Sequence, residues 1–332
     1  MNGEIINFLG SYTKSGTPVH DLTRFENLMH RLGDPQNSLK FVHVAGTNGK
    51  GSVVRMLANS LTLSGYKTGE FTSPFIYRYN DRIKINGKEI TDDDLARLIS
   101  VVKPIAESDC AGYSQFEITN AIAFMYFAEQ NCDIVVLETG VGGLNDSTNI
   151  IRDNICSVIM SISLDHTAIL GDKITDIAFQ KAGIIKDECP VVVYPCNPLE
   201  ANLVIDKYAA IHGSRVIHPD LTKLNILRSK PDGNAFSYKL RDYATAMPGN
   251  HQIYNAITAI EAAGVIKKKY KKLTDSKVFE GISTAVVPSR CQIVRKKDPM
   301  IIIDGAHNPD GMRALTEFVS KLPQYPKVMI CG

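Results

Sequence analysis

The amino-acid sequence predicts an α/β fold: a mostly parallel sheet with helices on both faces, and the start of a second, smaller α/β domain. The first observation is that short runs rich in valine and isoleucine alternate with segments of helical period, as in strand–helix–strand units. The second is that these runs are short and mostly apolar, which is typical of central strands covered on both faces. The third is the length, because 332 residues with 44% hydrophobic content suffice for two domains.

The predicted elements follow one another along the chain. The first strand, Phe41–Ala45, ends at Gly46 and leads through a turn into a helix. The apolar residues of that helix, Val53 to Leu61, recur every three or four positions, and Gly65 follows as its C-cap. Further strands are predicted at Asp133–Leu137, Ser157–Ile162 and Val191–Tyr194, and further helices over 118–128 and from about Gln252 to Lys267.

A domain boundary is predicted near residues 285–295, where the pattern resets before a new strand at Met300–Asp304. The two domains would then span residues 1–288 and 289–332, and the second would be Rossmann-like. Only 42 residues follow Arg290, whereas an independent domain usually has roughly 100 or more. Val328–Gly332 resembles another strand, cut off at its end, so we expect the chain to stop inside its second domain.

Composition excludes several classes of protein. Lysine and arginine number 37 against 35 acidic residues, a net charge of +2 that argues against nucleic acid as a partner. The lysine-rich run 267–272 is interpreted as a solvated helix end. No run of about 18 apolar residues predicts a membrane helix, and residues 1–4 lack the pattern of a signal peptide, so we expect a cytoplasmic protein. The seven cysteines form no CxxC pair, which favours reduced thiols over disulfides or a zinc site.

The strongest local motif is Gly46-Thr47-Asn48-Gly49-Lys50-Gly51-Ser52, between a predicted strand and a predicted helix. Glycines allow a tight turn whose N–H groups converge, and the helix N-terminus and Lys50 add positive charge. This arrangement suits a triphosphate, with Ser52 placed to bind Mg²⁺. The match to GxxxxGK[ST] is imperfect, because Val44 replaces the first glycine and Gly51 separates Lys50 from the hydroxyl. The context still favours a P-loop-type, nucleotide-binding domain over a glycine-rich turn with a solvated lysine.

Acidic and imidazole groups follow three other predicted strands. Glu138 ends one strand, ahead of a second glycine-rich turn at 140–146, and suits Mg²⁺. Asp165-His166 ends another, where a structural histidine and a ligand are about equally expected. Asp304–Pro309 concentrates polar groups on a tight turn, which favours functional use. Lys181 is unremarkable by itself, because most such lysines are solvated.

These residues together resemble the folylpolyglutamate synthase/dihydrofolate synthase family, within the Mur ligase superfamily of ATP-dependent amide ligases. The resemblance runs from about His20 to the end of the chain. The segments that carry it are Gly46–Ser52, Thr72–Pro74, Phe116–Thr119, Glu138–Asn149, Leu164–Thr167, Lys181–Gly183, Gly249–Gln252 with Asn255, Pro288–Arg290 and Asp304–Pro309. Each is weak to moderate alone, and their order and spacing are highly specific.

The resemblance implies a role for each matched residue. Residues 1–288 would form an ATP-binding domain of the Mur-ligase central type, and residues 289–332 would begin a C-terminal glutamate-ligase domain. Lys181 matches the lysine that is carbamylated in the superfamily. Gly46, Thr47, Asn48, Gly49, Lys50, Gly51 and Ser52 would hold ATP phosphates; Ser73, Glu138 and His166 would bind Mg²⁺; Asn255, Arg290, Asp304 and His307 would meet the nucleotide; and Phe116, Glu117, Thr119 and Asp146 would lie near the pterin-bearing substrate.

The implied reaction adds L-glutamate to the carboxylate of folates through an acyl phosphate, with dihydropteroate as a further candidate acceptor. Lys50, Lys181 and His307 are the implied catalytic residues, with His307 assisting the amine, and we expect a monomer. The sequence departs from the family at Leu144-Asn145, where Arg-Leu is common, and at His20-Asp21-Leu22. Both stretches face the pteroate in the family, so the assignment of dihydropteroate as a substrate is less secure than that of folates. Two alternatives stay open: another Mur-type amide ligase, or a nucleotide-binding fragment without ligase activity.

Overall fold

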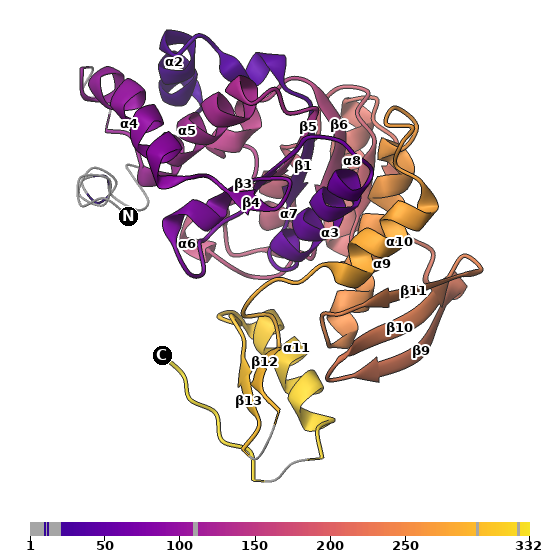
Figure 1. The fold of residues 1–332 in the computed structure, drawn as a ribbon. Helices are drawn as coiled ribbons and strands as arrows, with labels where there is room; N and C mark the ends of the chain where they lie inside the picture. Colours follow the sequence, from indigo (N-terminus) through magenta and orange to yellow (C-terminus); the bar gives the residue numbers. More distant parts are fainter. Residues whose placement is uncertain (1–9, 11, 13–20, 109–111, 297–298, 324–325) are drawn as a thin grey trace.

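The computed structural model describes residues 10, 12, 21–108, 112–296, 299–323 and 326–332, so His20 and Cys110 lie outside the described residues. An eight-stranded sheet forms the centre of the molecule, in the order β4-β3-β2-β5-β1-β6-β7-β8 (Figure 1). Its strands are β1 (Phe41–Ala45), β2 (Thr68–Phe71), β3 (Ile83–Ile85), β4 (Lys88–Glu89), β5 (Ile134–Glu138), β6 (Asn154–Ile159), β7 (Val191–Val193) and β8 (Val216–Ile217).

The sheet is parallel from β2 to β8, and β3 and β4 join antiparallel at one edge. Every residue of β1, β5 and β7 is buried. Parallel strands need crossover connections that run over the faces, so both faces are covered and the strands are mostly apolar. The predicted mostly parallel α/β sheet is confirmed.

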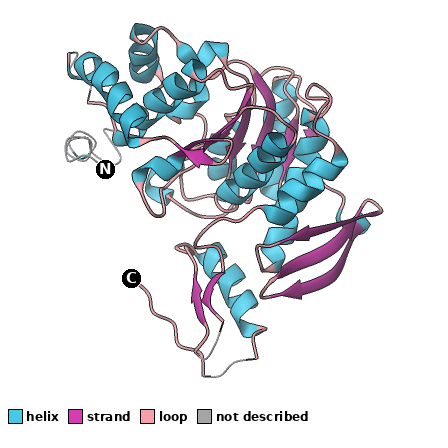
Figure 2. Ribbon diagram, viewed as in Figure 1, coloured by secondary structure: helices cyan, strands magenta, loops and turns pink. Residues whose placement is uncertain are grey.

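Helices pack against both faces of the sheet, as Figures 1 and 2 show. Val42, Val136 and Val158 point into one apolar core with α3 (Lys50–Leu63), α9 (Asn250–Ile266) and α10 (Asp275–Thr284). Phe41 and Leu137 point the opposite way, because successive side chains of a strand alternate between faces. That second face is covered by α2 (Thr23–Arg31), α4 (Asp92–Glu107) and α5 (Gln115–Glu129), and beside β6 and β7 by α7 (Ile174–Ala182) and α8 (Leu199–Ile211).

Two smaller sheets follow in the chain. The antiparallel sheet of β9 (Leu224–Lys230), β10 (Gly233–Tyr238) and β11 (Arg241–Thr245) was not predicted from the sequence. β12 (Gln292–Arg295) and β13 (Ile301–Ile303) pair next to α11 (Pro309–Ser320), around a separate small core that includes Cys291, Phe318 and Leu322. The domain limits 1–288 and 289–332 stay predictions. Shorter elements are α6 (Thr167–Leu170), η1 (Pro35–Ser38), η2 (Tyr79–Arg82), η3 (Ser147–Ile150) and η4 (Leu221–Lys223).

The strand predicted at the end of the chain is wrong for this structure. Val328 and Ile330 are 84% and 94% exposed, and residues 326–332 form no ladder with any described strand. An apolar run becomes a strand only where a partner strand satisfies its backbone, and none lies beside this segment in the described part of the chain.

The described cysteines are free thiols, and Cys132, Cys156, Cys189 and Cys291 are buried. This agrees with the expected reduced cysteines. Among the described residues, no helix is both long enough and apolar enough to cross a membrane.

Candidate active site

The phosphate loop lies between β1 and α3, at the carboxyl edge of the sheet. Gly46 has a φ of +149°, and a Cβ there would come within 2.4 Å of the Cβ of Met160. Gly49 has a φ of +86°, and a Cβ there would lie 2.5 Å from Oδ1 of Asn255. Both glycines are therefore required by backbone conformation and by close packing. The loop leads directly into the N-terminus of α3, which is a favourable place for anions.

Two lysines converge on this loop. Lys50 Nζ donates to the carbonyl oxygens of Gly46 and Thr47, at 3.0 and 3.2 Å. Lys181 Nζ donates to the same Gly46 oxygen at 2.8 Å and is only 3% exposed, although its sequence context suggested a solvated side chain. Burial, and next the charge of Lys50, lower the pKa of Lys181 to about 7. Lys181 therefore has a substantial neutral fraction at neutral pH.

Glu138 ends β5 beside the loop and is 3% exposed. Its Oε1 lies 4.0 Å from Lys50 Nζ, and the backbone N–H of Ser73 donates to Oε2 at 3.2 Å. Burial raises the pKa of this carboxyl to about 7, against the opposing effects of Lys50, Ser73 and Arg290. A desolvated carboxylate next to a hydroxyl residue is a good partner for a small hard cation.

His166 is the third predicted metal ligand, beside Ser73 and Glu138. It lies at the N-terminus of α6, its side chain is 48% exposed, and its Nε2 is 3.9 Å from Oδ1 of Asp165. Among the described residues, no group of three or more histidine, cysteine, aspartate or glutamate side chains is arranged to hold a metal ion. The hydrogen bond from Ser73 to Glu138 places these two predicted ligands together, and the role of His166 as a ligand stays a prediction.

The residues predicted to bind the nucleotide lie on α9 and on the turn after β13. Asn255 on α9 donates to Gln252 at 3.0 Å, and Gln252 donates to the Ser52 hydroxyl at 3.3 Å. Asp304 accepts the backbone N–H groups of Cys291 and Ala306, at 2.7 and 2.8 Å, and so braces the turn after β13.

His307 and Arg290, two further residues predicted to bind the nucleotide, lie in or against the turn after β13. His307 Nε2 is 3.8 Å from Oδ2 of Asp165. Arg290 packs on the same turn, since a Cβ on Gly305 would lie 3.2 Å from its guanidinium. A pocket of about 340 Å³ opens beside Arg290, Pro248 and Met300.

Two of the residues predicted to lie near the pterin-bearing substrate, Glu117 and Thr119, belong to helix α5. Glu117 caps α5 through Ser114 and accepts two bonds from Arg24, at 3.0 and 2.6 Å. Thr119 Oγ1 is buried 2.6 Å from the Tyr79 hydroxyl. These contacts show that both side chains already have partners inside the protein.

Phe116 and Asp146 meet at the second glycine-rich turn. A Cβ on Gly140 would lie 2.6 Å from Cζ of Phe116, so this turn packs directly on the ring. Asp146 Oδ2 accepts the N–H groups of Gly140 and Val141, both at 2.9 Å. Burial raises the pKa of Asp146, and these hydrogen bonds oppose the shift.

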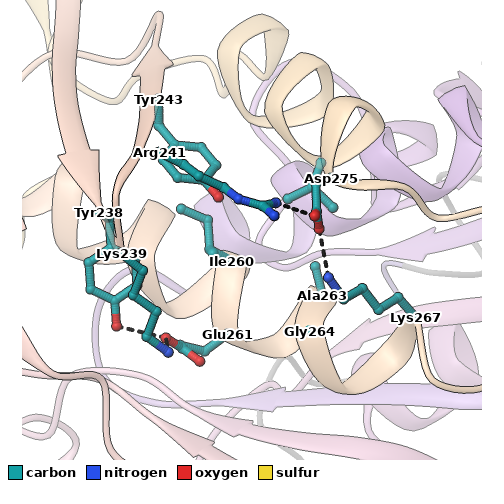
Figure 3. Close-up of a pocket in the computed structure, with 11 residues that line it drawn as sticks. Tyr238, Lys239, Arg241, Tyr243, Ile260, Glu261, Ala263, Gly264, Lys267 and Asp275 are labelled. Atoms are coloured by element: carbon teal, nitrogen blue, oxygen red, sulfur yellow. Dashed lines mark hydrogen bonds and ion pairs between the residues drawn. The ribbon is translucent and has the colours of Figure 1, made fainter. Parts of the chain in front are cut away.

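A separate pocket of about 310 Å³ lies between the β10–β11 hairpin and helices α9 and α10 (Figure 3). Its charged side chains are paired with one another: Lys239 with Glu261 at 2.5 Å, and both Arg241 and Lys267 with Asp275. The floor between the two charged groups includes Ile260. Since these charges already satisfy one another, the pocket is a poorer candidate site than the phosphate loop.

Comparison with known proteins agrees with this geometry. Residues 44–263 match the family described as the Mur ligase middle domain. The dihydrofolate synthase/folylpolyglutamate synthase of Bacillus subtilis is 40% identical over 309 residues, covering 89% of this chain and 71% of that protein. The folylpolyglutamate synthase of Lacticaseibacillus casei is 36% identical over 344 residues, covering 97% and 79%. A solved FPGS–AMPPCP–folate complex superposes with a TM-score of 0.90 at 33% identity, over 98% of this chain and 82% of that one.

The glycine-rich loop, its two lysines and the buried carboxylate at the edge of a parallel sheet define a nucleotide-binding α/β protein. The comparisons narrow that class. The chain belongs to the folylpolyglutamate synthase/dihydrofolate synthase family of Mur ligases.

The sequence analysis assigned no role to three residues that the structure places in the site, namely Asp165, Gln252 and Asn308. Asp165 accepts from Asn308 at 3.0 Å, and Gln252 links α9 to Ser52. All three lie inside or beside the segments that carry the family resemblance. A polar side chain next to a tight turn is a weak signal, and only the tertiary contacts identify its partner.

Proposed function

We propose that this chain is an ATP-dependent ligase that adds L-glutamate to folates, with dihydropteroate as a second candidate acceptor. The observation that carries the proposal is the convergence of Lys50, Lys181 and Glu138 on one phosphate loop. This site lies in a chain 40% and 36% identical to relatives named as folate ligases. The same fold holds AMPPCP and folate in a solved complex.

The chemistry needs activation, because a carboxylate carries a poor leaving group. An oxygen of the folate carboxylate attacks the γ-phosphorus of ATP, and the bond from that phosphorus to the bridging oxygen breaks to release ADP. The nitrogen of glutamate then attacks the acyl carbon, phosphate leaves, and the amine loses a proton as the amide forms. Lys50 and Arg290 would neutralise charge during phosphoryl transfer, where positioning and electrostatics provide most of the catalysis. His307 would assist the loss of the proton from the amine.

The residues present fit a magnesium ion. Mg²⁺ in nucleotide sites is held by one or two protein oxygens together with phosphates. The buried Glu138 carboxylate, whose pKa is raised by burial, would gain a compensating charge from it. We propose that Glu138, Ser73 and Ser52 hold the ion, with His166 as the further ligand that the resemblance implies. Bound there, the ion would supply charge neutralisation to the phosphates.

Lys181 fits carbamylation, the modification implied by the resemblance. The neutral amine is the form that reacts with CO₂, and burial lowers the pKa of Lys181 to about 7. The product would present a carboxylate in place of a cation beside the loop. Protein equilibrated with ¹³C-bicarbonate should show a carbamate signal by NMR that disappears in Lys181→Arg, and an identical spectrum for the two proteins would refute the assignment.

The remaining residues would bind the two substrates. Asn255 would contact the nucleotide from α9, where it lies against Gly49 of the loop. Arg290 and Asp304 would contact it from the turn after β13, which Asn308 joins to Asn48 of the loop. The binding site for the folate or pteroate would be formed by Phe116, Glu117, Thr119 and Asp146. These residues would either contact that substrate or hold the backbone that does.

We also propose a monomeric, cytoplasmic enzyme that needs neither nucleic acid nor a membrane. Light scattering of the purified protein would test the monomer, and fractionation of cells would test the location.

The deciding experiment is ADP release by this chain with ATP and Mg²⁺, adding tetrahydrofolate and L-glutamate singly and together. Dihydropteroate is the parallel acceptor, and a peptidoglycan precursor tests the other Mur-type ligases. We expect release to require both folate and glutamate. Release with the peptidoglycan precursor alone would replace the proposed substrate, and ATP binding without release would identify a nucleotide-binding fragment.

A further inference from the structure

His43 lies fully buried in β1, two residues before the strand ends. Burial lowers the pKa of its imidazole well below the ordinary value, and the nearby charge of Lys186 adds to the effect. The ring is therefore neutral at physiological pH. A neutral imidazole carries a single proton, on either Nδ1 or Nε2, and the neighbouring groups decide which.

The hydrogen bonds around His43 determine where that proton lies. Nε2 is 2.8 Å from Oγ1 of Thr148. The Thr148 hydroxyl donates to Oδ1 of Asp146, which also accepts three backbone N–H groups and is therefore a carboxylate. A hydroxyl has one proton to give, so toward His43 the Thr148 oxygen can only accept. The proton of His43 therefore lies on Nε2.

The other ring nitrogen is left without a partner. Nδ1 of His43 is buried and has no hydrogen-bond partner among the described residues. A buried acceptor with nothing to accept is unfavourable, and an apolar side chain of similar shape would avoid the penalty. For stability alone, a histidine is a poor choice at this position. Such an exception in a core calls for a functional explanation.

The hydrogen bonds of His43 connect the strand that leads into the phosphate loop with the glycine-rich turn at 140–146. β1 leads into the phosphate loop, and His43 reaches sideways from it to Thr148. Thr148 in turn holds Asp146, which closes the turn at 140–146, and that turn packs on Phe116. A continuous chain of contacts therefore runs from the nucleotide strand to the acceptor side.

We propose that His43 is a positioning residue of the ligation reaction. By donating from Nε2 to Thr148, it holds Asp146 and its turn at a fixed place relative to the phosphate loop. His43 acts through these residues and contacts neither ATP nor the acceptor itself. This inference rests on the proposed function, because that function assigns the turn to the acceptor.

Kinetics of two variants test the proposal. His43→Leu removes the donor, and His43→Gln keeps an amide N–H of similar reach. We expect His43→Leu to raise the folate KM about tenfold, the size of effect given by one lost buried hydrogen bond. The ATP KM should stay within about twofold of the wild-type value, and His43→Gln should recover most of the folate KM. The melting temperature of His43→Leu should not fall, because the orphaned Nδ1 is removed as well.

Two further variants separate positioning from loss of packing. Val42→Ala loosens the same strand on its opposite face, so it should lower the melting temperature without changing the ratio of the two KM values. Thr148→Val removes the acceptor, and the double variant His43→Leu/Thr148→Val should have the same folate KM as Thr148→Val alone. An additive loss in the double variant, or a wild-type folate KM in His43→Leu, would overturn the proposal.

The proton assignment has a readout that needs no turnover. In ¹⁵N-histidine-labelled protein, the signals that disappear in His43→Leu should report a neutral ring with its proton on Nε2. A proton on Nδ1, or a charged ring at neutral pH, would overturn the inference while leaving the proposed function intact. Absence of folate binding and turnover in the wild type would instead reject the proposed function, and this inference with it.

Discussion

The side-chain amides of Asn48 and Asn308 face each other and exchange two hydrogen bonds, each of 3.1 Å. Asn48 belongs to the phosphate loop, and Asn308 caps α11 through the N–H of Gly311. Asp165 accepts a further bond from Asn308, and Asp310 accepts one from Asn48. One buried asparagine thus joins the C-terminal helix to the loop that would hold ATP.

Replacing Asn308 should uncouple these two elements. We expect Asn308→Ser and Asn308→Ala to lower kcat/KM for ATP by about tenfold, because both lose the paired amides. Serine can still cap α11, so only the alanine variant should also lose about 1 kcal/mol of unfolding free energy. Steady-state kinetics with urea denaturation separates the two effects. A serine variant with wild-type kinetics would show that the amide pair is dispensable.

Lys50→Ala should reduce kcat by about a thousandfold, because phosphoryl transfer loses a fixed cation beside the loop. ADP release at saturating folate and glutamate measures this directly. Lys277→Ala is the matched control, since Lys277 lies on α10 and pairs with Glu280. Near-normal activity of Lys50→Ala would disprove the assignment of the phosphate loop.

Glu138→Ala should raise the Mg²⁺ concentration needed for half-maximal ADP release by at least about tenfold, because a buried carboxylate ligand is lost. The exposed Glu107 at the end of α4 provides the control Glu107→Ala. A magnesium titration that coincides with that of the wild type would remove Glu138 from the metal site.

Glu117→Gln should lower the free energy of unfolding by about 2 kcal/mol, because it breaks a nearly buried pair with Arg24 and weakens the cap of α5. Glu129→Gln breaks an exposed pair with Arg97 and should change stability by less than about 1 kcal/mol. Urea denaturation compares the two variants. If Glu117→Gln kept wild-type stability and only raised the folate KM, Glu117 would contact the substrate directly instead.

Lys186 should make the free energy of unfolding depend measurably on pH. Burial lowers its pKa from 10.5 to about 8, and its Nζ donates to the carbonyl of Asn149 at 2.8 Å. Between these two pKa values the unfolded chain binds the proton more tightly than the folded chain does. The unfavourable effect of burying the charge is therefore complete below about pH 8 and is relieved as the pH rises toward 10.5.

The variant Lys186→Met lacks this titration. We expect the unfolding free energy of the wild type, relative to Lys186→Met, to rise with pH across that window by up to about 1.4 kcal/mol per pH unit. Urea denaturation at several pH values measures the difference, and other titrating groups cancel between the two proteins. Parallel pH profiles would show that Lys186 keeps an ordinary pKa in the folded protein.

Much of the central sheet could be predicted from local sequence. β1, β5, β6 and β7 are short runs rich in valine and isoleucine next to turns, a strong signal because both faces of a parallel strand are buried. The sheet β9–β11 was missed, since β9 is largely exposed and lacks an apolar run. The final run, Val328–Gly332, resembles a strand in its local sequence, and no described strand lies beside it.

The sequence by itself determined the phosphate loop, the strand-end carboxylate Glu138 and the family, because these depend on residue type and on spacing along the chain. Only the tertiary structure decided the states of Lys181 and His43. Burial lowers the pKa of the Lys181 amine, and the contact with Thr148 makes His43 a donor from Nε2. In both cases the hydrogen-bond partner lies more than 100 positions away in the chain. Those partners meet because the carboxyl ends of parallel strands lie at one edge of the sheet, which no local pattern encodes.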